Sequence, residues 1–259
     1  MNLQLEGKTA LVTGSTKGIG FAIARALAWE GASVIVNGRS AEAADEAAAK
    51  IGHEARGIAG DVSTAAGCEA LVAAAPKVDI LVNNAGIFEP KPFAEIPDAD
   101  WERFYQMNVM SGVRLARAYL PGMLERKWGR VVFISSESGV QIPDEMIHYG
   151  MTKSAQLALV NGLAQLTKGT AVTVNAVLPG PTGSEGVTEF VAQLAAGAKQ
   201  TREEFEREFF RSVRPTSLLQ RFAEVDEVAN MVAFICSPLA SATNGAAVRV
   251  DGGVLRATT

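Results

Sequence analysis

The feature that most constrains the fold is a repeated alternation between short β-branched runs and longer alanine-rich stretches. The β-branched runs are nearly continuous in apolar residues and do not alternate with polar ones, which is typical of strands buried on both faces of a parallel sheet. We expect strands at Lys8–Val12, Ser33–Val36, Val78–Val82, Val131–Ile134, Val172–Val177 and Ala246–Val250. Helical patterns occupy Gly18–Glu30, Ala41–Ile51, Ala65–Ala74, Trp101–Glu125, Tyr149–Thr167 and Val225–Cys236.

Repetition of strand, helix and strand predicts right-handed crossovers and a doubly wound parallel sheet, the α/β Rossmann fold, with about seven strands and helices on both faces. No linker divides the 259 residues, so we expect a single domain over 1–259. One segment, at about 181–220, departs from the alternation of strands and helices, and its pattern predicts a helical insertion. It would either pack on the body or, as its place after a strand end favours, form a lid over a substrate pocket.

Composition narrows the classes of function. The net charge of −4 gives no electrostatic reason to expect a nucleic-acid partner, and no apolar run reaches the length of a membrane span. The N-terminus lacks the pattern of a secretory signal, which makes the cytoplasm the default expectation. Cys68 and Cys236 lie in apolar helical patterns and are expected to be buried thiols, and with two histidines in the chain no metal site is expected.

A glycine-rich loop follows the first strand and opens the first helix. Such a loop lets the backbone approach a pyrophosphate, whose charge the free N–H groups of a helix N-terminus can bind. The candidate cofactor-binding residues here are Gly14, Ser15, Thr16, Lys17, Gly18, Ile19 and Gly20.

The end of the second strand predicts which dinucleotide is bound. In dinucleotide folds a carboxylate at this point binds the adenosine ribose, but here Asn37 is followed by Gly38 and then Arg39. Arg39 and Lys17 together suit a 2′-phosphate, because a guanidinium can hold phosphate oxygens in two places. We therefore expect NADP(H) to be preferred over NAD(H); the alternative is that both cations are ordinary solvated charges.

Tyr149 and Lys153 are four residues apart at the start of a helical pattern, so they share one face. A nearby ammonium favours the phenolate and should lower the tyrosine pKa from about 10 toward neutrality, where proton exchange is efficient. A tyrosine and a lysine at this spacing are commonplace in amphipathic helices, so the pair indicates a catalytic role only together with the motifs around it.

Those motifs occur in order at successive strand ends. They are Asn83-Asn84-Ala85-Gly86, Asn108 in a long helix, Ser135-Ser136, Pro179-Gly180 and Asp251-Gly252-Gly253. Together with the glycine loop and the Tyr/Lys pair, they make the chain resemble the short-chain dehydrogenase/reductase family in its shorter, single-domain form, from Gly7 to Gly253.

The resemblance implies a catalytic role for four residues. Tyr149 would be the acid in carbonyl reduction and the base in alcohol oxidation, while Lys153 would hold the nicotinamide ribose. Ser136 would donate a hydrogen bond to the substrate oxygen. Asn108 would hold a water that links Lys153 to solvent; the alternative is a hydrogen bond inside its helix.

The resemblance also implies further cofactor contacts. Asp61 and Val62 would contact the adenine, although Asp61 could instead cap a helix. Asn83, Ala85 and Gly86 would line the adenosine ribose. Pro179 and Gly180 end a strand beside the cofactor, and Thr182 and Ser184 would reach the nicotinamide carboxamide.

The resulting expectation is an NADPH-dependent oxidoreductase for a small carbonyl or alcohol substrate. A variant is a 3-oxoacyl-[acyl-carrier-protein] reductase, with Arg126, Lys127 and Arg130 as a docking patch unless they are only solvated charges. A non-catalytic NADP(H) sensor is disfavoured by the intact catalytic positions, and a nucleotide-sugar epimerase usually needs a longer C-terminal region.

In the family the two long central helices build the interface of a homodimer or homotetramer. His148 is expected to be structural or at a pocket edge.

Overall fold

Seven parallel strands form one sheet in a computed structural model of the chain, which describes residues 1–185 and 201–257. The sheet has the order β3-β2-β1-β4-β5-β6-β7, so the chain reverses its direction of travel between β1 and β4. The strands are β1 (Thr9–Val12), β2 (Ser33–Gly38), β3 (Arg56–Ala59), β4 (Ile80–Asn83), β5 (Trp128–Ile134), β6 (Ala171–Pro179) and β7 (Ala247–Val250). The predicted doubly wound sheet is confirmed.

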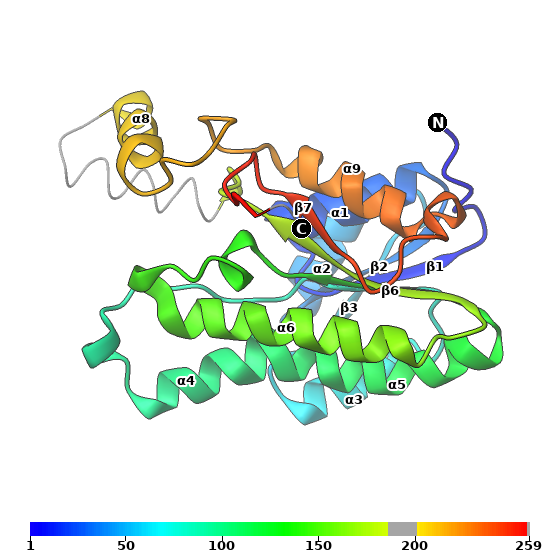
Figure 1. Cartoon of the computed structure of the whole chain (residues 1–259). Helices are drawn as coiled ribbons and strands as arrows, with labels where there is room; N and C mark the ends of the chain where they lie inside the picture. Colours follow the sequence, from blue (N-terminus) through cyan, green and yellow to red (C-terminus); the bar gives the residue numbers. More distant parts are fainter. Residues whose placement is uncertain (186–200, 258–259) are drawn as a thin grey trace.

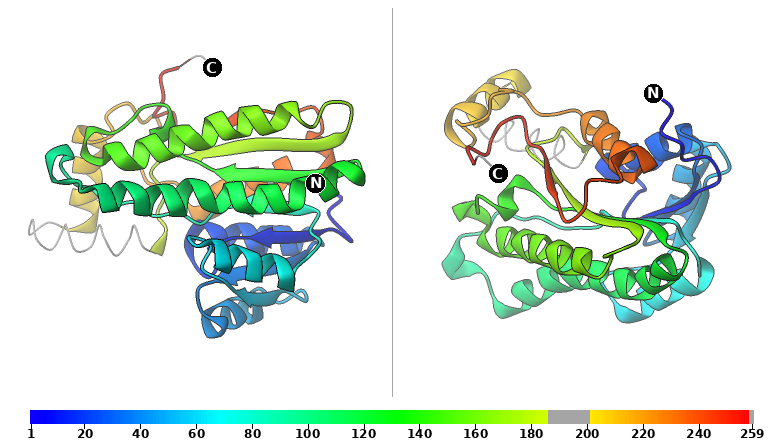
Figure 2. Two further views of the ribbon diagram at one scale, coloured as in Figure 1. Left: turned by 90° about the horizontal axis from the view of Figure 1, so that it is seen from below. Right: turned by 45° about the vertical axis from the view of Figure 1, so that its right-hand side comes forward.

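Helices cover both faces of this sheet (Figures 1 and 2). On one face lie α1 (Gly18–Trp29), α2 (Ala41–Ile51) and α9 (Val225–Cys236), and on the other α3 (Ala65–Ala74), α4 (Asp98–Tyr105), α5 (Ser111–Glu125) and α6 (Ile147–Gln165). A further helix, α8 (Arg202–Ser212), projects beyond the end of the sheet.

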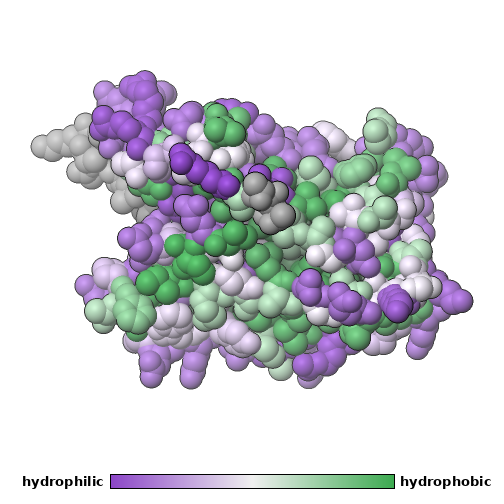
Figure 3. Space-filling model, in the orientation of Figure 1, coloured by the Kyte–Doolittle hydropathy of each residue, from purple (hydrophilic) through white to green (hydrophobic). Residues whose placement is uncertain are grey.

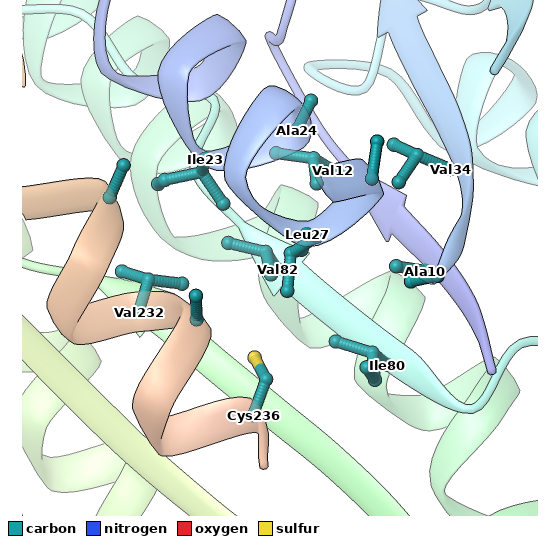
Figure 4. Close-up of a cluster of buried hydrophobic side chains, with 14 of the residues drawn as sticks. Ala10, Val12, Ile23, Ala24, Leu27, Val34, Ile80, Val82, Val232 and Cys236 are labelled. Carbon is teal, nitrogen blue, oxygen red and sulfur yellow. The ribbon is translucent and has the colours of Figure 1, made fainter. Parts of the chain in front are cut away.

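Burial on both faces explains why the strands are continuously apolar. In β1, Ala10 and Val12 point into the core beneath α1 and α9, where Figure 4 shows them beside Leu27 and Val232. Leu11, between them in sequence, packs into the opposite core beneath α3, α5 and α6. Neighbouring strand positions therefore both face a core, which favours consecutive apolar side chains. Cys68 and Cys236 are free and buried, as predicted.

The single helix predicted at Trp101–Glu125 is wrong in its interior. The helix begins three residues earlier, at Asp98, and a π-helical stretch at Gln106–Met110 separates α4 from α5. Two carbonyls of this stretch accept hydrogen bonds from side chains: Ser111 Oγ donates to the carbonyl of Met107, and Gln156 Nε2 donates to that of Asn108. A π-bulge of this kind often marks a functional site.

The other expected helices need smaller corrections. The helix predicted at Tyr149–Thr167 runs from Ile147 to Gln165, whereas the short helix Ala65–Ala74 lies where it was predicted. Among the described residues, no helix is both long and apolar enough to span a membrane.

The insertion predicted at about 181–220 is described only in part, since residues 186–200 lie outside the described residues. Within the described part, α8 starts at a capping box formed by Thr201 and Glu204. Phe209 stacks on Phe222 with ring centroids 5.2 Å apart, which fixes α8 against the loop that follows it.

Candidate active site

The structure brings the four predicted catalytic residues together at the carboxyl end of the sheet. Ser136 lies just after β5, Tyr149 and Lys153 lie on the first turns of α6, and Asn108 lies in the π-helical stretch. Lys153 Nζ is 5.6 Å from the centre of the Tyr149 ring. Gly86 lies against this group, because a Cβ on it would be 3.4 Å from Asn108 Oδ1 and 3.6 Å from Lys153 Nζ.

Lys153 is a buried cation held by neutral acceptors. Its Nζ donates to the carbonyl of Ile134 at 2.8 Å and to Gln156 Oε1 at 3.4 Å. Burial disfavours the charged form and lowers the pKa of Lys153 to about 8. The ammonium is therefore still charged at neutral pH but close to its titration range.

The environment of Tyr149 differs from the prediction. The side chain is half-buried and Phe88 meets it edge-on, with ring centroids 6.4 Å apart. Burial raises the pKa of Tyr149 above its ordinary value, and a hydrogen bond with Ser136 only partly opposes this. The expectation that Lys153 lowers this pKa is thus not met here, because loss of hydration outweighs the attraction of an ammonium bonded elsewhere. At neutral pH Tyr149 is a protonated phenol and can donate a proton.

Asn108 fixes the loop after β4 rather than its own helix. Its Oδ1 accepts from the backbone N–H of Ile87 at 2.8 Å, and its Nδ2 donates to the carbonyl of Ile87 and to Thr152 Oγ1, both at 3.0 Å. The alternative of a bond inside its helix is therefore wrong. The described contacts connect Asn108 to Lys153 through a side chain, that of Gln156, which the sequence analysis did not single out.

Two further residues of the site, Glu137 and Arg214, were not predicted from the sequence. Glu137 is 5% exposed, and its carboxylate accepts from Ser136 Oγ at 2.5 Å and from Ser138 Oγ at 2.7 Å. Arg214, which follows α8, donates to Glu137 Oε1 at 3.2 Å and to Glu145 Oε1 at 3.2 Å. Because Glu137 directly follows Ser136, its place in the site could have been predicted from the sequence. No sequence pattern indicates that Arg214 lies near the end of β5.

A cavity of about 480 Å³ opens beside this ion-paired cluster. It lies between the loop after β5 and the end of α8, and its volume suits a small-molecule ligand. Its lining residues are Glu137, Gln141, Ile142, Pro143, Asp144, Glu145, Ser212, Val213, Arg214 and Val254.

Hydrogen bonds and close packing within the protein fix the backbone of the glycine loop. Gly14 has a φ of +60°, and a Cβ there would come within 3.0 Å of Ala85 Cα. The buried Ser15 hydroxyl donates to the carbonyl of Val12 and accepts from the N–H of Asn37. Lys17 precedes α1 without a side-chain cap, so no cap occupies the first amides of the helix. This backbone fits a pyrophosphate.

Asn37 supports the same loop from β2. Its Oδ1 accepts from the N–H of Gly14 at 3.3 Å, and its Nδ2 donates to the carbonyls of Ile58 and Gly60, both at 3.2 Å. Asn37 is buried, and its backbone N–H and carbonyl both bond Ser15, so it supports the loop from beneath, and its contact with the cofactor stays a prediction.

The two predicted phosphate-binding cations, Lys17 and Arg39, are exposed. Neither forms an ion pair within residues 1–185 and 201–257. Gly38 directly precedes Arg39, and a Cβ on it would approach Thr16 Cγ2, the neighbour of Lys17, to 2.5 Å. The site thus has no room for the ribose-binding carboxylate at position 38 without a shift of Thr16.

Two of the predicted adenine and ribose contacts have other partners in the structure. The exposed Asp61 accepts from the N–H and hydroxyl of Ser63. Thr64 caps α3, so the alternative role of Asp61 as the helix cap is wrong. Val62 packs into the core. The buried Asn83 side chain has no hydrogen-bond partner among the described residues.

The loop after β6 lies across the glycine loop. A Cβ on Gly18 would be 3.3 Å from Ser184 Cβ, which brings the predicted carboxamide-binding segment to the cofactor side. Thr182 instead turns inward and donates to the carbonyl of Gly180 at 2.9 Å. Pro179 and Gly180 end β6 beside Asp251, as the motif order predicts.

Two residues outside the catalytic group take buried positions. His148 is fully buried, which agrees with the structural of its two expected roles, and its ring lies 4.0 Å from that of Phe104 and 5.9 Å from that of Trp101. Arg130 cannot join a docking patch with Arg126, because it is 1% exposed and donates to the carbonyls of Gly129, Ala171 and Ser237.

Comparison with known proteins identifies the family of the chain. Residues 8–195 match the short chain dehydrogenase family model. The chain is 50% identical over 261 residues to an uncharacterized oxidoreductase, YvaG, of Bacillus subtilis, with 99% of each chain covered. It is 36% identical to the 3-oxoacyl-[acyl-carrier-protein] reductase FabG of Aquifex aeolicus over 98% of this chain and all of that one. The structure of L-sorbose reductase from Gluconobacter frateurii, complexed with NADPH and L-sorbose, superimposes with a TM-score of 0.94 at 31% identity, covering 99% of this chain and 100% of that one.

Proposed function

This chain belongs to the short chain dehydrogenase family of oxidoreductases, and from that premise we propose that it is an NADPH-dependent enzyme that reduces a carbonyl to an alcohol, or runs the reverse reaction, with Tyr149 as the acid and base. The observation that carries the proposal is the convergence of Ser136, Tyr149 and Lys153 beside a cavity at the carboxyl end of the sheet. A merely structural helix start would not need a buried ammonium next to a phenol.

The glycine loop and its neighbours would hold the dinucleotide. The uncapped N-terminus of α1 and the close approach of Gly14 to Ala85 fit the pyrophosphate, and Lys153 would hold the nicotinamide ribose. When bound, the cofactor would supply the hydride. The chain itself then needs to orient the substrate and to handle one proton.

Reduction builds negative charge on the substrate oxygen, and two hydroxyl groups are placed to meet it. Ser136 can turn its hydroxyl from Glu137 toward this oxygen, and Tyr149, protonated at neutral pH, can give its proton to complete the alcohol. Lys153 supplies positive charge near the phenolate that remains. In oxidation the same groups act in the opposite order.

The preference for NADP(H) over NAD(H) is part of the proposal. It is supported by the exposed cations Lys17 and Arg39, neither of which forms an ion pair within the described part of the chain, and by the Thr16 methyl that a side chain at Gly38 would meet. The NADPH in the superimposed sorbose reductase agrees with it.

We also propose that the enzyme acts in the cytoplasm as a homodimer or homotetramer. Helices α4, α5 and α6 lie together on one face of the sheet, and apolar side chains gather in a band across the side of the molecule that carries α6 (Figures 1 and 3). A contiguous apolar surface of this kind favours burial against a second subunit.

Reduction of 3-oxoacyl groups on acyl carrier protein is the second candidate. The relationship to FabG favours it, but the docking patch considered in the sequence loses Arg130 to the protein interior. The chemistry at Tyr149 would be the same for both substrates.

The proposal is tested by NADPH consumption against a panel of ketones, diketones, sugars and 3-oxoacyl thioesters. We expect at least one carbonyl class to be reduced by the wild-type protein. Tyr149→Phe should retain NADPH binding and lose about 10²–10⁴-fold in kcat, the usual contribution of a positioned acid. Full activity of Tyr149→Phe would refute the assignment of the acid.

A further inference from the structure

Glu137 belongs both to the candidate reaction centre and to the cavity beside it. Its Oε2 accepts from Ser136 Oγ, the hydroxyl proposed to meet the substrate oxygen, while Glu137 also lines the cavity. Any substrate bound at Ser136 with a part extending into this cavity therefore passes a nearly buried carboxylate. The chemical character of the cavity wall then decides which substrates fit.

The cavity has an excess of negative charge. Its lining carries three carboxylates, those of Glu137, Asp144 and Glu145, against the guanidinium of Arg214. That guanidinium is already bonded to two of the carboxylates, at 3.2 Å each, and its side chain is only 12% exposed. An anionic group that approached Arg214 would come beside both carboxylates, in surroundings where charges are weakly screened.

The same wall disfavours a plain alkyl or acyl chain. Covering the Glu137–Arg214 pair with methylene groups would remove its remaining hydration without offering a hydrogen bond in return. Hydroxyl groups, by contrast, can donate to the carboxylate oxygens and exchange hydrogen bonds with Gln141 and Ser212. Ile142, Pro143, Val213 and Val254 leave room for a carbon skeleton between these polar groups.

We propose that the cavity selects a neutral, hydroxyl-bearing carbonyl compound, such as a keto-polyol, over anionic and alkyl compounds, and that Glu137 sets the discrimination against anions. This inference rests on the proposed function, since it assigns the substrate class of the same site. It separates the enzyme from both a keto-acid reductase and a reductase of long acyl groups.

The test compares the binding of three six-carbon probes by calorimetry, with and without NADP⁺: a hexitol, a hexonate and 1-hexanol. Because binding is read directly, it does not depend on turnover. We expect the hexitol to bind at least about tenfold more tightly than the hexonate, and 1-hexanol to be weaker still. In Glu137→Gln, which keeps the shape and removes one charge, the hexitol-to-hexonate ratio should fall at least about threefold, whereas the exposed Glu125→Gln should leave it unchanged.

NADPH oxidation with a ketohexose, a keto-hexonate and a 3-oxoacyl thioester completes the experiment. A hexonate or 1-hexanol that binds as tightly as the hexitol, or a hexitol that does not bind, overturns the inference even if some carbonyl is reduced. Preferred turnover of the keto-hexonate or the thioester overturns it as well. If no carbonyl is reduced but the hexitol is still selected through Glu137, the inference stands and the proposed function fails.

Discussion

At the scale of single residues, the cofactor preference depends on what surrounds Gly38. A Cβ at this position would approach Thr16 Cγ2 to 2.5 Å, so a ribose-binding carboxylate there would require Thr16 to shift. Lys17 and Arg39 are both exposed, and neither has an ion-pair partner among the described residues. Two such cations close in sequence to Thr16 and Gly38, with no carboxylate at position 38, suit a phosphate better than a hydroxyl group.

The Lys17→Ala, Arg39→Ala double variant should therefore lose affinity for NADPH by about 10–100-fold, because charge-assisted hydrogen bonds to a phosphate are removed. Affinity for NADH should change by less than about twofold, since a ribose hydroxyl gains little from either cation. Fluorescence titration with each cofactor measures both values. The exposed pair Lys50→Ala, Lys77→Ala is the matched charge control, and equal losses for NADPH and NADH would contradict the preference.

At the scale of elements, the π-helical stretch between α4 and α5 joins the site to α6. Asn108 lies in this stretch, and Gln156 Nε2 donates to its carbonyl at 2.5 Å. The other end of the same amide accepts from Lys153 Nζ. Gln156, only 2% exposed, thus positions the ammonium relative to the two helices.

Gln156→Leu should lower kcat about tenfold, because Lys153 loses an acceptor that favours its charged form. For the same reason the pKa of Lys153, already lowered to about 8 by burial, should fall further, and the alkaline limb of the pH–kcat profile should move to lower pH. Gln165→Leu, an exposed position on the same helix, serves as the control. A loss of kcat without a shift of the pH profile would indicate a purely structural role.

The sequence predicted the parts of the site that follow from strand order. Parallel strands place their carboxyl ends at one edge, so Ser136, the loop of Gly86 and the glycine loop could be placed together from their positions after strands. The π-helical stretch could not be predicted, because no local pattern marks it and the side chain that bonds its Asn108 carbonyl, Gln156, is 48 residues away. The role of Arg214 could not be predicted either, since it and Glu137 are 77 residues apart in the sequence.

At the scale of the whole molecule, a histidine buried in the core makes stability depend on pH. His148 is fully buried, and neither ring nitrogen has a hydrogen-bond partner among the described residues. Burial lowers the pKa of His148 below its ordinary value of 6.5, although Asp100 and Glu89 partly oppose this. The folded protein therefore binds fewer protons at this residue than the unfolded chain does.

The contribution of the neutral His148 to stability is therefore complete above the unfolded pKa of about 6.5, and it is lost as the pH falls below that value. In His148→Leu the melting temperature should decline less between pH 7 and pH 5 than in the wild-type protein. The exposed His53, at a φ of +49°, gives the control His53→Asn, which tolerates that backbone. Parallel melting curves for wild type and His148→Leu across this range would contradict the account.

The most direct test of the central claim follows the hydride and the proton together. The enzyme is incubated with the best carbonyl substrate of the panel and with NADPH deuterated at the transferred position of C4, and the deuterium content of the alcohol is measured by mass spectrometry. We expect one deuterium on the carbinol carbon with the wild-type enzyme and at least about 100-fold slower formation of this product with Tyr149→Phe. An alcohol without deuterium, or labelled product formed equally fast by Tyr149→Phe, would contradict it.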